Sequence, residues 1–161
     1  MNKVLYFPKK KKGLGGMYSV YDIAAYILGR EIPNMAHKKL QKLCYYVQAW
    51  ALAIRGERLI DCTFEAWVHG PVSPELYQIC KRSMNTVDGQ EPNNLDLKTA
   101  EFVDVILSMY GSLTGEQLET LTHSEEPWKQ ARGELPYWQG SRRRISEDIM
   151  SGYYRKELER I

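Results

Sequence analysis

Residues 36–55 read AHKKLQKLCYYVQAWALAIR, and they contain the strongest periodic pattern of apolar residues in the sequence. Its apolar residues recur every three or four positions along one stripe, as they do on an amphipathic helix. The opposite side begins with Lys38 and Lys42, which predicts a solvated side in the first half, and it becomes apolar from Tyr45 onward. The second half is therefore apolar nearly all round. We expect a central helix that neighbours bury on more than one face and that Gly56 ends.

Other stripes of apolar residues are shorter, and most of them start or stop at a residue that commonly caps helices. They predict short helices near residues 20–28, 74–80, 102–110, 114–121, 127–132 and 146–158. Residues 64–68 are aromatic and β-branched, which predicts a strand. Residues 69–74 contain two prolines that fix φ and predict a rigid turn, and residues 142–145 are a candidate second strand that pairs with 64–68. The sequence thus predicts a mainly α fold, a compact bundle of about six short helices with a small antiparallel β-element.

The composition is that of a globular protein, with 43% hydrophobic and 26% charged residues among 161. No apolar run approaches the roughly 18 residues that a membrane span needs, so we expect no membrane segment. Cys44, Cys62 and Cys80 are odd in number and form no CxxC pair. This pattern argues against a secreted disulfide framework and favours reduced thiols in the cytoplasm.

The positive charge is concentrated at the start of the chain. Residues 1–12 hold five lysines and no acid, and the remainder has 17 basic and 20 acidic residues, a net charge of −3. Because a lysine run followed by glycines cannot pack a core, residues 1–16 are interpreted as a flexible basic tail before a single domain at 17–161. The tail is either a solvated extension or an arm that contacts nucleic acid. The acidic remainder argues against DNA binding by the folded part.

The residues that commonly carry chemistry form no recognisable catalytic set. His37, His69 and His123 lack metal-ligand spacing, and Cys44 and Cys80 fall on apolar helix stripes. No nucleotide-binding motif occurs. We therefore expect no enzyme activity, no metal and no cofactor. One alternative stays open, a metal-dependent hydrolase whose site combines His69, His123 and an acid.

Four segments occur in an order that resembles a known family. They are DIAAYIL at 22–28, KLQKLCYYVQAW at 39–50, AWVHGPVSPELY at 66–77 and LTHSEEPWKQA at 121–131. Together they resemble the Panacea domain of SocA-like and phage-associated GepA-like antitoxins, over roughly residues 19–155. The second and third segments carry most of the specificity, and residues 1–16 are not part of the pattern.

The resemblance implies an antitoxin of a bacterial or phage toxin–antitoxin system. Such proteins neutralise a cognate toxin encoded by the adjacent gene. Some members bind the toxin directly, and at least one type is an adaptor that delivers the toxin to a AAA+ protease. The family implies neither a metal nor an enzyme activity. The other functions left open are a DNA-binding transcriptional regulator and an anti-defence phage protein that binds a host immune target.

A toxin-binding patch is expected where the turn at residues 69–74 meets the start of the central helix. A turn stiffened by proline loses little entropy on binding, so contacts made there convert well into affinity. The interpretation is an interaction patch with a basic rim. Its residues are Lys39, Lys42, Tyr46, His69, Pro71, Val72 and Tyr77. Leu40, Leu43 and Trp67 are instead expected to maintain the fold.

Overall fold

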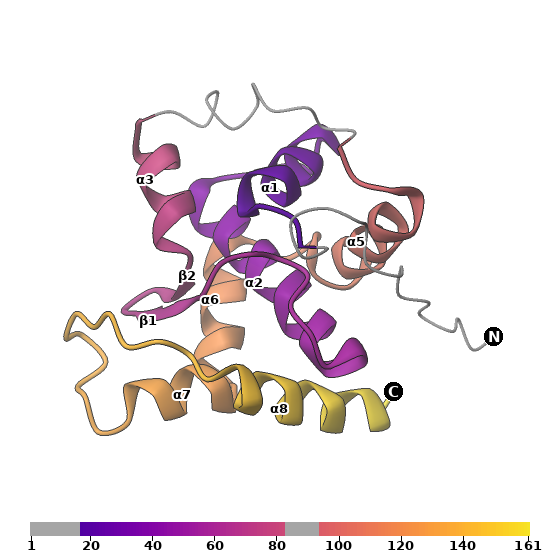
Figure 1. Ribbon diagram of the computed structural model, residues 1–161. Helices are drawn as coiled ribbons and strands as arrows, with labels where there is room; N and C mark the ends of the chain where they lie inside the picture. The colour runs from indigo at the N-terminus through magenta and orange to yellow at the C-terminus, as the bar shows by residue number, and fades with distance from the viewer. Residues whose placement is uncertain (1–16, 83–93) are drawn as a thin grey trace.

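The computed structural model describes residues 17–82 and 94–161. Helix α2 (His37–Arg55) passes through the middle, and the other elements pack around it (Figure 1). Around it lie α1 (Val20–Gly29), α3 (Pro74–Arg82), α5 (Leu97–Tyr110), α6 (Gly115–Ser124), α7 (Glu126–Arg132) and α8 (Glu147–Glu159). The expected mainly α fold with a small antiparallel sheet is confirmed. The predicted tail at residues 1–16 lies outside the described residues.

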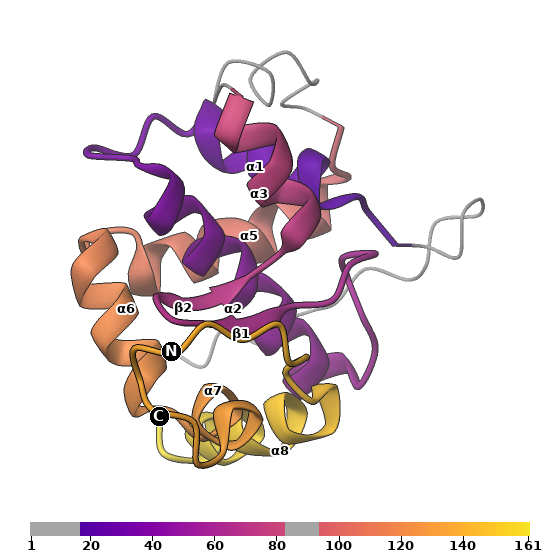
Figure 2. The ribbon, with the colours of Figure 1, turned by 90° about the vertical axis from the view of Figure 1, so that its left-hand side faces the viewer.

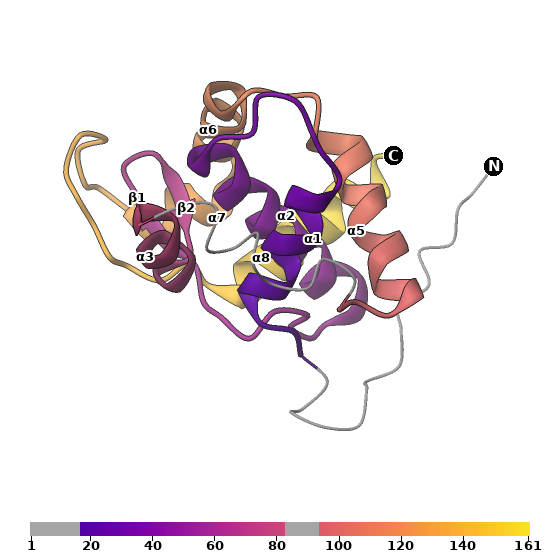
Figure 3. The same cartoon turned by 90° about the horizontal axis from the view of Figure 1, so that it is seen from above.

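Helix α2 is the centre of the hydrophobic core, as its sequence predicts. Residues 39–53 are all buried, and α1, α3, α5, α6 and α8 each contact the helix. Seen from above, α1, α5 and α6 lie around it (Figure 3). The expectation of a solvated side in its first half is wrong, because α6 and the hairpin cover it and Lys42 is 1% exposed.

Two buried glutamines of α2 bind the backbone of the segments that pass alongside the helix. The Gln48 side-chain oxygen accepts hydrogen bonds from the N–H groups of Leu59 and Ile60, at 3.0 and 2.9 Å. The Gln41 side chain accepts from the Ser73 N–H at 2.9 Å and donates to the Ser73 carbonyl at 3.1 Å. Since buried backbone groups need partners, these amides fix the chain on both sides of the hairpin.

The sheet is a hairpin of β1 (Glu65–Trp67) and β2 (Gly70–Val72), paired antiparallel with Trp67 opposite Gly70. The expectation of a turn over all of residues 69–74 is therefore wrong. The turn contains only Val68 and His69, and Gly70 begins the return strand at φ 109°. Residues with a side chain rarely adopt this backbone conformation, so the position favours glycine.

Pro71 is compatible with a strand because of its register. It faces Ala66, whose N–H points away from β2 and donates to the Arg143 carbonyl at 2.8 Å. An antiparallel pair that exchanges no hydrogen bonds does not need the N–H that proline lacks. The predicted pairing of residues 142–145 with β1 exists as one antiparallel bridge between Glu65 and Arg144, and in Figure 2 this segment runs beside β1.

Helices α1, α6 and α8 begin at the cap residues that the sequence predicts. Thr114 and Gln117 form a reciprocal capping box at α6, and the side chains of Ser19 and Ser146 accept hydrogen bonds at the starts of α1 and α8. None of the helices in the described parts of the chain combines the length and the apolar character needed to cross a membrane.

Candidate functional site

A cavity of about 690 Å³ lies between the first turns of α2, the hairpin, α3 and the segment that follows α7. We call it the hairpin cavity. Its apolar wall includes Trp67, Val72 and Tyr77, and the rings of Trp67 and Tyr77 meet edge to face at 4.8 Å. Its other residues include the cations Lys38, Lys42 and Arg142 and the imidazoles of His37 and His69. No carboxylate is among the described residues that line it.

The hairpin cavity brings together four of the seven residues expected in the interaction patch. Lys42, His69, Val72 and Tyr77 all line it. Pro71 is buried in β2 and does not line it. The seven residues therefore do not form the single patch with a basic rim that was expected. The role of Lys42, His69, Val72 and Tyr77 in toxin binding stays a prediction.

Lys39 and Tyr46 lie in other parts of the interior. Lys39 lines a second cavity, of about 640 Å³, where its amine donates to the carbonyls of Gly111 at 2.7 Å and Pro33 at 3.3 Å. Tyr46 is fully buried, and its hydroxyl donates to Glu125 at 2.7 Å. Sequence periodicity placed them near the turn, but packing directs their side chains elsewhere.

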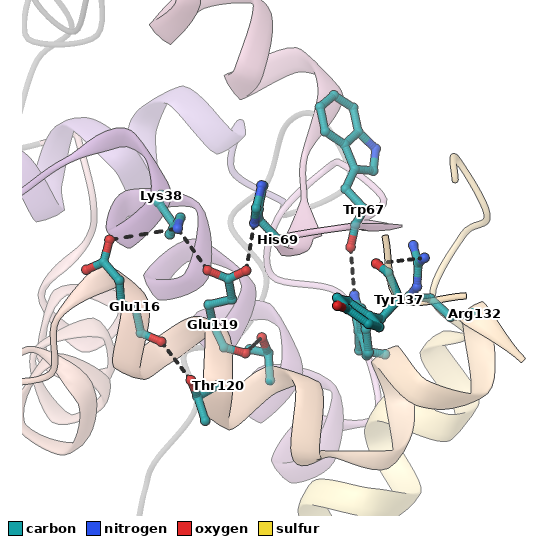
Figure 4. A network of polar contacts seen from close by, with 10 residues as sticks. Lys38, Trp67, His69, Glu116, Glu119, Thr120, Arg132 and Tyr137 are labelled. Atoms are coloured by element: carbon teal, nitrogen blue, oxygen red, sulfur yellow. Dashed lines mark hydrogen bonds and ion pairs between the residues drawn. The ribbon is translucent and has the colours of Figure 1, made fainter. Parts of the chain in front are cut away.

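Glu119 of α6 holds two of the polar residues at the cavity rim (Figure 4). One carboxylate oxygen accepts from the Lys38 amine at 2.8 Å, and the other lies 2.7 Å from His69 Nδ1. Burial raises the pKa of Glu119, but the hydrogen bonds with Lys38 and His69 outweigh it, so that the pKa is lowered overall. Both oxygens of this carboxylate are therefore committed to partners.

Lys42 differs from Lys38 because its amine has no such partner. Within residues 17–82 and 94–161, the amine of Lys42 makes no hydrogen bond or ion pair. Burial lowers the pKa of Lys42 to about 7, although the nearby charge of Glu119 opposes the shift. The cavity wall thus contains a buried amine that loses its proton more easily than an ordinary lysine.

Two exposed aromatic side chains lie in the loop between α7 and α8, residues 133–146, which we call the α7–α8 loop. Tyr137 is 76% and Trp138 is 67% exposed. Residues 140–142 of the same loop form part of the cavity wall. The loop that carries the aromatic pair therefore also contributes to the cavity wall.

Arg132, at the end of α7, holds the α7–α8 loop in place. Its buried guanidinium donates to the carbonyls of Ala66 at 3.1 Å, Pro136 at 2.9 Å and Gln139 at 2.6 Å. Charge-assisted bonds to three carbonyls give this irregular segment a fixed path. Helix α7, from which the loop starts, is itself tied to β1, since Trp128 Nε1 donates to the Trp67 carbonyl at 2.9 Å.

Tyr137 and Trp138 are not among the residues that the sequence patterns predict for an interaction patch. The available signal was a Tyr-Trp pair between Pro136 and Gly140, outside any helical stripe. Large aromatic residues in a polar loop have no core to fill, and this is the feature that could have identified them.

A metal site of His69, His123 and an acid is not assembled. In the part of the chain that the structure describes, no group of three or more His, Cys, Asp or Glu side chains is placed to hold a metal ion. His123 instead stacks on Trp128 with ring centroids 3.9 Å apart.

Comparison with known proteins identifies one family. A family model described as "Antitoxin SocA-like, Panacea domain" matches residues 40–129. The match includes Lys42, the hairpin and α3, whereas the α7–α8 loop lies beyond its end. Neither the curated proteins nor the solved structures contain a significant match.

Proposed function

The chain belongs to the SocA-like antitoxin family defined by the Panacea domain, and we propose that it neutralises a toxin protein by binding it directly. The toxin is the product of the adjacent gene, and the encounter takes place in the cytoplasm. The contact surface combines the hairpin cavity with the α7–α8 loop.

The observation that carries this choice of surface is the exposed pair Tyr137 and Trp138. Tyrosine and tryptophan are the residues most enriched among interface hot spots. Exposing two of them side by side costs solubility, so a partner that covers them accounts for their presence. Because Arg132 already fixes the loop, little conformational entropy remains to be lost on binding.

The adjoining cavity supports the same surface. It offers a concave, partly apolar depression next to a protruding aromatic pair, which together suit a partner that has both a projection and a shallow apolar face. His69 and Tyr77, both expected from the sequence to take part, lie at this depression.

The test is co-expression of the adjacent gene with wild-type and variant antitoxin. We expect the adjacent gene alone to arrest growth and the wild-type chain to restore it. The double variant Tyr137→Ala with Trp138→Ala should fail to restore growth and should bind the purified toxin about 30-fold more weakly or worse. Leu97→Ala is the matched control, since it removes a large side chain that is 74% exposed on α5.

Circular dichroism and melting curves establish that each variant is folded. Growth restored equally by the double variant would overturn the choice of surface, and an adjacent gene that is harmless alone would overturn the antitoxin function. The half-life of the toxin distinguishes sequestration, which leaves it unchanged or longer, from delivery to a AAA+ protease, which shortens it.

A further inference from the structure

Lys42 has a buried amine for which the described residues provide no hydrogen-bond or ion-pair partner. Lysine is rarely fully buried without a partner, because removing an ammonium group from water is costly. Lys42 is 1% exposed, and the nearest source of negative charge, Glu119, already has Lys38 on one oxygen and His69 on the other. The hairpin cavity is therefore the remaining direction from which a counter-charge can reach the amine.

Comparison with Lys39 shows what a structural lysine does on the same helix. Lys39 is 2% exposed, but its amine bridges the carbonyls of Gly111 and Pro33 and so ties two segments together. Within the described residues Lys42 makes no equivalent bond. An apolar side chain of the same length would fill its space, so packing alone does not explain a lysine.

The Lys42 side chain packs against the hairpin at Gly70, where glycine leaves room for it. A Cβ at position 70 would lie 2.6 Å from Lys42 Cε, so a residue other than glycine at this position would displace the lysine side chain. The amine thus has a defined path along the hairpin to the cavity wall.

The side chains that line the hairpin cavity favour a negatively charged ligand. Among the described lining residues Lys38, Lys42 and Arg142 are basic and none is a carboxylate. Lys38 is paired with Glu119 and Arg142 lies 3.8 Å from Glu65, so the amine of Lys42 is the basic group of this wall that has no acidic partner among the described residues. Trp67, Val72 and Tyr77 supply apolar surface to the same wall. A carboxylate that enters such a site forms a stronger ion pair than it would on an open surface.

We propose that an aspartate or glutamate side chain of the bound toxin enters the hairpin cavity and forms an ion pair with Lys42. This inference rests on the proposed direct binding of the toxin. The carboxylate supplies the counter-charge that Lys42 lacks in the free protein, and the apolar stem of the acidic residue packs against Trp67 and Tyr77. Glu119 keeps Lys38 and His69 in place at the rim during binding.

The experiment compares Lys42→Met with Lys156→Met, which removes one positive charge from the exposed face of α8. Affinity for the purified product of the adjacent gene is measured by calorimetry. We expect Lys42→Met to weaken binding about 30-fold or more, and Lys156→Met to leave it within about threefold. We also expect Lys42→Met to melt at the same temperature as wild type or higher, which distinguishes a binding residue from one that supports the fold.

The partner carboxylate is then identified by substituting each exposed Asp and Glu of the toxin by Asn or Gln. One of these changes should weaken binding by wild type but have little further effect on Lys42→Met, as a double-mutant cycle requires of a contacting pair. Unchanged affinity of Lys42→Met for a toxin that wild type binds overturns this inference alone. Absence of any binding by wild type overturns the proposed function as well. Saturable binding of free glutamate that Lys42→Met abolishes would assign the cavity to a small carboxylate instead of the toxin.

Discussion

The side chain of Lys42 lies directly against the backbone of Gly70, across the contact between α2 and β2. A Cβ at position 70 would be 2.6 Å from Lys42 Cε and 2.9 Å from Thr122 Oγ1. Gly70 also has φ 109°, a conformation that only glycine adopts readily. One residue therefore sets both the close return of the hairpin and the path of the buried lysine.

Gly70→Ala should destabilise the protein by about 2–4 kcal/mol, because backbone strain and overlap with Lys42 act together. Gly152→Ala is the control, since position 152 lies in α8 with no atom within 4 Å of an added Cβ. This change should be neutral or stabilising by up to about 1 kcal/mol. Urea denaturation of both variants measures the difference, and equal midpoints would contradict the steric role of Gly70.

Glu125 should lower the stability of the protein as pH rises from about 4.5 to about 7. This carboxyl group is 7% exposed, and burial raises its pKa to about 7 although the hydroxyls of Tyr46 and Tyr154 donate to it. The folded state therefore holds a proton that the unfolded state releases at lower pH. Linkage converts this difference into a loss of up to about 3 kcal/mol on passing through that window.

Glu125→Gln tests this dependence, because the amide cannot ionise but keeps an oxygen that accepts from both tyrosines. We expect the variant to exceed wild type by about 1–3 kcal/mol at pH 8 and to match or fall below it at pH 4.5. Chemical denaturation at several pH values gives the comparison. Parallel pH profiles for the two proteins would show that Glu125 is not the titrating group.

The gain in stability that Lys42→Met gives over wild type should shrink as pH rises, whereas the gain from Glu125→Gln should grow. The pKa of Lys42 is lowered from 10.5 to about 7 by burial, with Lys38 adding to the effect and Glu119 opposing it. The folded state bears the cost of a buried ammonium below pH 7, and this cost declines as pH rises from about 7 to 10.5. The gain in stability from methionine should therefore be about 1–3 kcal/mol near pH 6 and smaller near pH 9. A gain that does not change with pH would be a packing effect.

Arg132→Lys should loosen the α7–α8 loop. A lysine amine cannot reproduce the fork of donors that reaches Ala66, Pro136 and Gln139 at once, so we expect a loss of about 1–3 kcal/mol. Hydrogen exchange at residues 137–142 should accelerate while the amides of α2 stay protected. The control is Arg160→Lys, a change at an exposed ion pair with Glu157. Unchanged exchange in the loop would mean that Arg132 does not hold it.

The central helix was predictable because periodicity is a local property. The stripe through Leu40, Leu43 and Val47 and the apolar second half indicate burial on several faces without knowledge of the neighbours. The capping box of α6 was predictable for the same reason, since it involves residues only three positions apart. The exposure of Lys42 was not predictable, since it depends on α6 and the hairpin, which cover that side of the helix from distant parts of the sequence.

The return strand illustrates another limit. Two prolines and a glycine in residues 69–74 favour a turn by local rules, and a proline inside a strand is disfavoured. Gly70–Val72 becomes a strand because Pro71 faces a position that exchanges no hydrogen bond, which only the register with β1 decides. The surface role proposed for Tyr137 likewise depends on Arg132 and on carbonyls that the fold brings to it.

The proposed function requires that the toxin contacts the α7–α8 loop and the hairpin cavity. Its most direct test is the dissociation constant of the purified product of the adjacent gene for wild type, for the Tyr137→Ala and Trp138→Ala double variant, and for Leu97→Ala. We predict tight binding by wild type and Leu97→Ala and a loss of about 30-fold or more for the double variant, with all three proteins folded. Equal dissociation constants for the three proteins would contradict it.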